Sequence, residues 1–365
     1  MNFTDKPNFF RQIINQNKRP LVIAGPCSAE SELQVLETAK LLKPQVDIFR
    51  AGTWKPRSRP NSFEGIGTDA LVWLQQVKQE TGLPVATEVA TPAHAEAALK
   101  HNVDVLWIGA RTTVNPFAVQ EIADALRGTS VPVMVKNPVN PDLALWAGAI
   151  ERIYKAVSAD VAAIHRGFTS FEPSHYRNVP AWQIPIELKQ RYKELPLIID
   201  PSHIGGHPDL IFPITQKAMD LDYDGMMIEV HPNPKDALSD ADQQITPAAL
   251  TEILAKLKVR CTSSTDKEFI NKAEELRHKI DAADRELIEV LARRMALVQQ
   301  IGEYKKQNNV TVLQMDRWNE IFRTRPEWAA KMGVNKKFVA ELYKLIHIES
   351  IRKQTAVIME EKEKK

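Results

Sequence analysis

The sequence predicts an α/β protein: a (β/α)8 TIM barrel, followed by a smaller all-α domain of three helices that dimerises. Two observations predict the barrel. Eight short apolar runs recur along the first 231 residues, and amphipathic segments lie between them. Strands too apolar to have a solvated face imply a parallel sheet covered by helices, and eight such units fit a barrel. The third observation is that the C-terminal residues lack such runs and repeat apolar residues at helical spacing.

Proline precedes or opens several of the apolar runs, as expected where a turn leads into a strand. We expect strands at Leu21–Pro26, Asp47–Ala51, Pro84–Val89, Val105–Ala110, Pro132–Lys136, Val161–His165, Leu197–Asp200 and Met226–Val230. The amphipathic segments predict helices at Ser31–Lys43, Thr68–Glu80, Pro92–His101, Pro116–Leu126 and Leu143–Val157. A doubly wound open sheet is the alternative, but no Gly-x-Gly-x-x-Gly follows any strand, which disfavours a dinucleotide-binding fold.

The chain is expected to divide into a barrel domain, residues 1–257, a linker, residues 258–267, and a helical domain, residues 268–365. Asp266 is a suitable N-cap for a helix that continues to about Lys306. Such a helix is about 60 Å long at 1.5 Å per residue, which favours pairing with another chain. Two shorter helices are expected at Gln314–Thr324 and Lys336–Met359.

Composition limits the class of function. The net charge of +2 gives no drive toward nucleic acid or acidic membranes. No apolar run is long enough to cross a bilayer. Two cysteines, Cys27 and Cys261, are too few for a disulfide framework, so a reducing cytoplasm is the expected location.

A barrel holds its active site at the C-terminal ends of its strands. All eight expected ends carry a charged or metal-competent residue: Cys27, Arg50, Glu88, Arg111, Lys136, Arg166, His203 and Glu229. Polar residues are also ordinary where strands meet water, and a lone cysteine is often a core residue. One thiol, one imidazole and two carboxylates nevertheless make a plausible site for one divalent transition metal ion, Mn, Fe, Co or Zn. These candidate ligands are Cys27, His203, Glu229 and Asp240.

Cations also gather at the strand ends and in the loops after them. They are Arg50, Lys55, Arg57, Arg111, Lys136 and Arg166. Arginine binds phosphate and carboxylate through a planar fork, and lysine acts as a point charge. Unless these residues are scattered surface charge, they predict a site for a small substrate with more than one anionic group.

Five motifs in one order carry a resemblance. They are Gly25-Pro-Cys-Ser28, Lys55-Pro-Arg-Ser58, Gly109-Ala-Arg-Thr-Thr113, Asp200-Pro-Ser-His203 and Glu229-Val-His-Pro232 with Ala237-Leu-Ser-Asp240. Over about residues 10–255 the chain resembles the short class of 3-deoxy-D-arabino-heptulosonate 7-phosphate (DAHP) synthases. The resemblance implies a condensation of phosphoenolpyruvate with erythrose 4-phosphate, in which water is consumed and phosphate leaves.

The resemblance also implies roles for single residues. The four candidate ligands match the metal site of the family, and Arg50, Lys55, Arg111, Lys136 and Arg166 match its phosphoenolpyruvate site. Lys136 or a group linked to the metal would donate a proton to the developing alkoxide. Arg57 and Ser58 match the contact with the phosphate of the aldehyde. The related octulosonate 8-phosphate synthases are the alternative, but Lys55-Pro-Arg57 favours the four-carbon aldose phosphate.

On the long helix, Arg294 and Lys305 share one face, because 11 residues return to nearly the same angle. This face carries the apolar stripe, so the cations are costly there unless they meet an anion or extend to solvent. Five motifs resemble the all-helical chorismate mutases, whose sites are built by both chains of an intertwined dimer. They are Leu276-Arg277-x-x-Ile280-Asp281, Leu291-Ala-Arg-Arg294, Gly302-x-x-Lys305, Asp316-Arg317 and Ser350-Ile-Arg-Lys-Gln354.

This second resemblance implies a metal-free rearrangement of chorismate to prephenate. Arg277, Arg294 and Arg317 would hold carboxylates, Lys305 and Gln354 would contact the ether oxygen, and Ser350 would contribute a hydroxyl contact. Gln314 and Trp318 depart from the family, in which acids often lie near the substrate hydroxyl. The expected protein is therefore a bifunctional enzyme, a homodimer or larger, that binds neither nucleic acid nor membrane. The alternative is a helical domain that only dimerises or regulates, and we also expect chorismate or prephenate to exert feedback through it.

Overall fold

The computed structural model describes residues 9–55, 63–157, 160–260 and 263–359. The chain divides into two compact units, Met1–Thr262 and Ser263–Lys365. In the part that is described, no helix is both long and apolar enough to span a bilayer.

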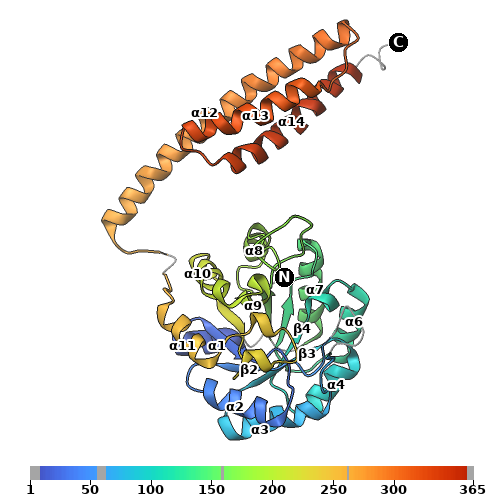
Figure 1. Ribbon diagram of the computed structural model, residues 1–365, viewed down its shortest axis with the longest axis vertical. Coiled ribbons are helices and arrows are strands. Elements are labelled where there is room, and N and C mark those ends of the chain that lie inside the picture. Colours follow the sequence, from blue (N-terminus) through green and yellow to red (C-terminus); the bar gives the residue numbers. More distant parts are fainter. Residues whose placement is uncertain (1–8, 56–62, 158–159, 261–262, 360–365) are drawn as a thin grey trace. The chain divides into compact units, whose positions relative to one another are not determined.

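The first unit is a closed barrel of parallel strands, in which each strand pairs with the next and β8 pairs with β1 (Figure 1). The strands are β1 (Leu21–Gly25), β2 (Ile48–Arg50), β3 (Val85–Val89), β4 (Val105–Ile108), β5 (Val133–Lys136), β6 (Val161–His165), β7 (Leu197–Ile199) and β8 (Gly225–Glu229). The predicted barrel is confirmed, and the strand limits agree with the prediction to within two residues.

Helices cover the outside of the barrel. They are α2 (Glu32–Leu42), α3 (Asp69–Thr81), α4 (Pro92–Lys100), α6 (Pro116–Ala125), α7 (Leu143–Ala156), α8 (Gln183–Arg191), α10 (Ile211–Asp220) and α11 (Pro247–Lys256). Side chains that accept from the free N–H groups cap several of them, including Ser31, Thr91, Asn115 and Asp142. Two short helices, α5 (Ala110–Thr113) and α9 (Pro201–Gly205), follow β4 and β7 at the ends where the site lies.

Helix α1 (Phe9–Asn17) was not predicted, because the first residues read as polar. Phe10 is fully buried in the cluster that also holds Ile23, Trp107 and Met227. Its backbone N–H donates to Asp160 Oδ2 at 3.2 Å, just before β6 begins. Helix α1 therefore closes the N-terminal end of the barrel, opposite the strand ends that carry the site.

The second unit consists of three helices, α12 (Lys267–Gln307), α13 (Met315–Lys331) and α14 (Lys336–Met359). Asp266 caps α12 as predicted, by accepting from the N–H groups of Glu268 and Phe269. The prediction for α13 was wrong at its end, because the helix continues past Pro326 to Lys331. Ile321 and Ala329, on either side of the proline, are both buried, and their packing outweighs the hydrogen bond that Pro326 cannot donate.

A buried histidine in the barrel makes the stability of the first unit depend on pH. His165 Nε2 lies 2.7 Å from the carbonyl oxygen of Pro180, which can only accept, so this nitrogen carries the proton. Nδ1 then accepts from the Tyr223 hydroxyl at 2.9 Å. Burial lowers the pKa of His165 to about 3, so the folded protein holds a neutral imidazole.

We expect acid to destabilise the barrel through His165. The unfolded chain binds a proton below about pH 6.5 and the folded chain does not, so this contribution is complete above that pH and is lost as the pH falls toward 3. Between pH 7 and 5 the loss should be about 2 kcal/mol. Urea unfolding of the full chain at both pH values measures it. His165→Gln should show a smaller difference between the two pH values, and His175→Gln, at an exposed histidine, should match the unmodified protein.

Candidate active sites

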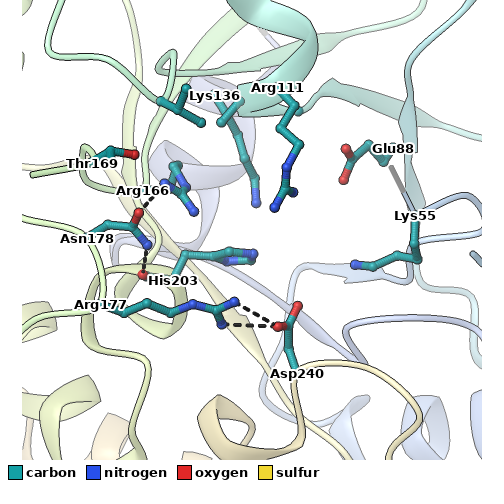
Figure 2. Close-up of a pocket in the computed structure, with 13 residues that line it drawn as sticks. Lys55, Glu88, Arg111, Lys136, Arg166, Thr169, Arg177, Asn178, His203 and Asp240 are labelled. Atoms are coloured by element: carbon teal, nitrogen blue, oxygen red, sulfur yellow. Dashed lines mark hydrogen bonds and ion pairs between the residues drawn. The ribbon is translucent and has the colours of Figure 1, made fainter. Parts of the chain in front are cut away.

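A pocket lies at the C-terminal ends of the barrel strands. Figure 2 shows the side chains of Arg111, Lys136 and His203 directed toward one central space. The residues that line it follow seven different strands: Lys55, Glu88, Gly109, Ala110, Arg111, Lys136, Val139, Arg166, Thr169, Arg177, Asn178, His203 and Asp240. Sequence positions far apart therefore meet at one mouth, as the barrel fold requires.

Cations dominate this pocket, and the deeper ones have carboxylate partners. Lys136 Nζ lies 2.8 Å from Asp200 Oδ2. Arg50 Nη1 lies 2.9 Å from Glu229 Oε1, and both side chains are 1% exposed. Arg50 also lies over the ring of Trp107, 4.6 Å from its centroid. These pairs fix the cations in place before any substrate arrives.

Two further arginines face the pocket without a carboxylate partner in the described chain. Arg166 donates to Asn178 Oδ1 at 2.7 Å, and burial lowers its pKa to about 10, so it stays charged at neutral pH. Arg111 makes no hydrogen bond or ion pair with the residues that the structure describes. The pocket therefore has positive charge in excess and suits a ligand with several anionic groups.

The four candidate metal ligands lie together as two contacting pairs. Cys27 follows β1, and its thiol donates to Asp240 Oδ2 at 3.4 Å. His203 lies on α9 after β7, and its Nε2 is 3.8 Å from Oε1 of Glu229, the last residue of β8. Strands β1 and β8 are neighbours, with Gly25 opposite Glu229. The barrel thus brings together ligands that lie about 200 positions apart in the sequence.

Neighbouring groups orient two of these ligands. His203 Nδ1 lies 2.8 Å from Asp200 Oδ2, which leaves Nε2 toward Glu229. Arg177 donates to Asp240 Oδ1 at 3.0 Å, which leaves Oδ2 toward Cys27. A carboxylate behind a ligating imidazole is the usual arrangement around protein metals. Burial raises the pKa of Glu229, but His203 and Arg50 outweigh burial and bring it to about 2, so a carboxylate is available.

The charged side chain of Lys55 lies beside the four candidate metal ligands. Lys55 Nζ is 3.0 Å from Cys27 Sγ. No three of the His, Cys, Asp and Glu side chains in the described chain close into a metal cluster on their own. Burial, followed by Glu229, raises the pKa of Cys27 to about 12, so the thiol is neutral. The residues fit a divalent metal by donor type and orientation. Metal binding would require Cys27 to lose its thiol proton and the four ligands to move closer together.

A second pocket lies in the helical unit, between α12, α13 and α14. It is lined by Arg294, Leu297, Val298, Ile301, Lys305, Gln314, Arg317, Ile321, His347, Ser350 and Gln354. Arg294 Nη1 donates to Ser350 Oγ at 2.8 Å, and Lys305 Nζ donates to the carbonyl of Val312 at 2.5 Å. Burial lowers the pKa of both cations. No acidic side chain lines this pocket among the described residues, so it also suits an anion.

Most of the site residues predicted from the sequence lie in or next to one of the two pockets. Lys55, Arg111, Lys136, Arg166, His203 and Asp240 line the barrel pocket, and Cys27, Arg50 and Glu229 lie directly behind it. Arg57 and Ser58 lie outside the described residues. Arg294, Lys305, Arg317, Ser350 and Gln354 line the helical pocket, whereas Arg277 is exposed on α12 and does not line it.

Several residues of the two pockets were not predicted from the sequence. Asp200 belongs to one of the motifs, but its contacts with Lys136 and His203 depend on the fold and cannot be read from the motif. His203 lies on α9, a single short helical turn that ends at Gly205 and was not among the predicted helices. Arg177 and Asn178 follow an irregular segment after β6 that has no periodicity. His347 was also missed, since helical spacing alone does not separate a pocket face from a core face.

Both units resemble known protein families. The model of the DAHP synthetase I family matches residues 4–264, and that of chorismate mutase type II matches residues 276–355. A phospho-2-dehydro-3-deoxyheptonate aldolase of Thermotoga maritima is 32% identical over 242 residues, which cover 65% of this chain and 68% of that protein. A 2-dehydro-3-deoxyphosphooctonate aldolase of Vesicomyosocius okutanii is 27% identical over 260 residues, 65% of this chain and 89% of its own.

Solved structures of DAHP synthases resemble about two thirds of this chain. The crystal structure of a phospho-2-dehydro-3-deoxyheptonate aldolase (DAHP synthase) from Thermotoga maritima matches with a TM-score of 0.58 and 29% identity, over 65% of this chain and 67% of that one. A truncated form of the enzyme from the same organism matches with a TM-score of 0.56 and 26% identity, over 65% and 84%. Both resemblances inferred from the motifs are therefore confirmed.

Asp200 should control metal affinity through His203. We expect Asp200→Asn to weaken the binding of Co²⁺ or Zn²⁺ by about 10–100-fold, because the imidazole loses the carboxylate that orients it. Competition with a chromophoric chelator measures the affinity of the metal-free protein. Asp209→Asn is the matched control, since Asp209 contacts His207 at 3.5 Å but is 88% exposed. Equal affinity of Asp200→Asn and the unmodified protein would contradict this role.

Proposed function

We propose a bifunctional activity for this chain, which belongs to the DAHP synthetase I family and carries a chorismate mutase domain in addition. The barrel condenses phosphoenolpyruvate with erythrose 4-phosphate to DAHP and phosphate, and the helical domain converts chorismate to prephenate. The observation that carries the first activity is the contact of Cys27 with Asp240 and of His203 with Glu229 beside the cations of the barrel pocket.

In the proposed barrel reaction, the cations hold phosphoenolpyruvate by its carboxylate and phosphate. Arg111 and Arg166 have no carboxylate partner in the described chain, and Lys55 and Lys136 extend into the same pocket. Carbon 3 of phosphoenolpyruvate bonds to the aldehyde carbon, water adds to carbon 2, and phosphate leaves. Lys136, held by Asp200, gives its proton to the oxygen that was the aldehyde. A metal held by Cys27, His203, Glu229 and Asp240 would polarise or orient the aldehyde oxygen.

The four-carbon aldehyde is proposed from Lys55-Pro-Arg57, which favours it over a five-carbon one. Relatives named as octulosonate aldolases match the same part of the chain, so an octulosonate synthase is the second candidate for the barrel. Mn, Fe, Co and Zn all suit this mixed ligand set. The buried free Cys27 supports a reducing cytoplasm as the location.

In the proposed mutase reaction, the helical pocket holds chorismate in a compact conformer. Arg294 and Arg317 bind carboxylates, with Ser350 fixing Arg294. Lys305 and Gln354 stabilise the negative charge that grows on the ether oxygen. The rearrangement is unimolecular, so positioned charge is sufficient and no metal is required.

A second copy of the chain is proposed to cover α12. Helix α14 packs along its C-terminal half, where Val298 and Gly302 are buried, and α13 packs on α14 (Figure 1). The N-terminal half leaves Leu276, Ile280 and Leu287 48%, 59% and 52% exposed. An apolar face of this length is a liability for a monomer. In a dimer, Arg277 on this half would reach the site of the partner chain.

A regulatory role of the helical domain is the further candidate, motivated by Gln314 and Trp318 in place of acids. In that case chorismate or prephenate would bind there and restrain the barrel. A helical domain that only regulates would show no mutase activity, whereas one that also catalyses would show both effects.

Metal removal should separate the two activities. After chelation of the purified full chain, synthase turnover with erythrose 4-phosphate should fall to background and return with Mn²⁺, Fe²⁺, Co²⁺ or Zn²⁺, while mutase turnover stays unchanged. With metal, kcat/KM for erythrose 4-phosphate should exceed that for arabinose 5-phosphate by about tenfold or more. Synthase activity that survives complete chelation, or a preference for the five-carbon aldehyde, would overturn this half of the proposal.

Arg294 should be required for the mutase alone. Arg294→Ala should lower mutase kcat/KM by about 100-fold or more, since one charged contact to the reacting dianion is lost. Arg293→Ala is the matched control, because Arg293 is exposed and does not line the pocket. Synthase turnover should be the same in both variants, and equal mutase activity in both would exclude this pocket as the site.

A further inference from the structure

Two buried polar atoms of the helical pocket have no hydrogen-bond partner among the residues that the structure describes. They are Nε2 of His347 and Oε1 of Gln354, and both residues line the pocket. Buried polar atoms in proteins almost always have a partner, so such an atom in a pocket indicates a missing ligand group. The three cations of the pocket have protein partners: Arg294 donates to Ser350, Lys305 donates to the Val312 carbonyl, and Arg317 donates to Glu320.

His347 lies one turn before Ser350 on α14, so the two side chains share a face of the helix. Its ring packs edge-on against Trp318 at 4.1 Å between centroids. Burial, followed by Arg294 and Lys305, lowers the pKa of His347, so the imidazole is neutral at physiological pH. A neutral imidazole has one donor and one acceptor nitrogen and adds no charge to the pocket.

The remaining charges of the pocket show which ligand group suits His347. Arg294, Lys305 and Arg317 are complementary to two carboxylates and a developing negative oxygen. The ring hydroxyl of chorismate is uncharged, and no acidic side chain in the described part of the pocket is available to accept from it. A neutral partner such as His347 matches a neutral hydroxyl, and Trp318 shields that hydrogen bond from water.

We propose that His347 binds the ring hydroxyl of chorismate through Nε2 and is a substrate-contacting residue of the mutase site. This inference rests on the proposed mutase function. His347 would bind the substrate hydroxyl and Trp318 would shield this hydrogen bond, in place of a carboxylate that the described part of the pocket lacks.

The test is mutase kinetics of the full chain with His347→Leu and His347→Gln. His347→Leu removes both nitrogens at similar size and should raise KM for chorismate about 5–20-fold, with kcat changed less than threefold. His347→Gln retains an amide near the position of Nε2 and should recover most of the affinity. An analogue of chorismate that lacks the ring hydroxyl should bind the unmodified protein and His347→Leu equally well.

The possible outcomes are distinct. An unmodified protein without mutase activity would defeat the proposed function itself. An active protein whose KM is unchanged in His347→Leu would overturn this inference alone. If the leucine variant does not fold, His347→Phe decides the question, because it keeps a ring and lacks both nitrogens: a KM raised at least fivefold supports the hydrogen bond, and a smaller rise overturns it.

Discussion

The pairing of β1 with β8 is the constraint on which the barrel site depends. It places Gly25 opposite Glu229 and brings the segment of Cys27 beside the segment of Asp240. Gln244 Oε1 accepts from the Cys27 N–H at 3.0 Å, and Gln243 donates to Glu229 Oε2 at 2.6 Å. The loop after β8 therefore holds both the segment after β1 and the end of β8 in place. On the other side of β1, a Cβ at Gly25 would lie 2.0 Å from the carbonyl oxygen of Arg50, the last residue of β2. The ends of β1 and β2 can therefore approach this closely only because residue 25 is glycine.

Both pockets hold several cations in a partly buried position, where they can bind an anionic substrate. In the barrel, Arg50 and Lys136 have buried carboxylates behind them, whereas Arg111 remains unpaired in the described chain. In the helical unit, Arg294 and Lys305 rely on a hydroxyl and a backbone carbonyl instead. Neutral partners leave the positive charge undiminished, which suits a pocket that must hold a dianion.

The barrel and its metal-competent residues were predictable, because buried parallel strands are continuous apolar runs and their ends are marked by polar residues. The limits of β6 followed directly from this pattern. Other features depend on tertiary contacts that no local pattern carries. Helix α1 exists because Phe10 fills the barrel end, and α13 continues through Pro326 because the helix packs on α14 and buries residues on both sides of the proline. Arg177 and His347 gain their significance only from what lies opposite them in space.

The central claim is that one sulfur, one ring nitrogen and two carboxylate oxygens converge on one ion at the barrel mouth. X-ray absorption at the cobalt edge of the full chain loaded with one equivalent of Co²⁺ tests this claim most directly. The account predicts one sulfur neighbour at about 2.3 Å together with nitrogen and oxygen neighbours at about 2.0–2.2 Å. A spectrum with no sulfur neighbour, unchanged by Cys27→Ser, would contradict it.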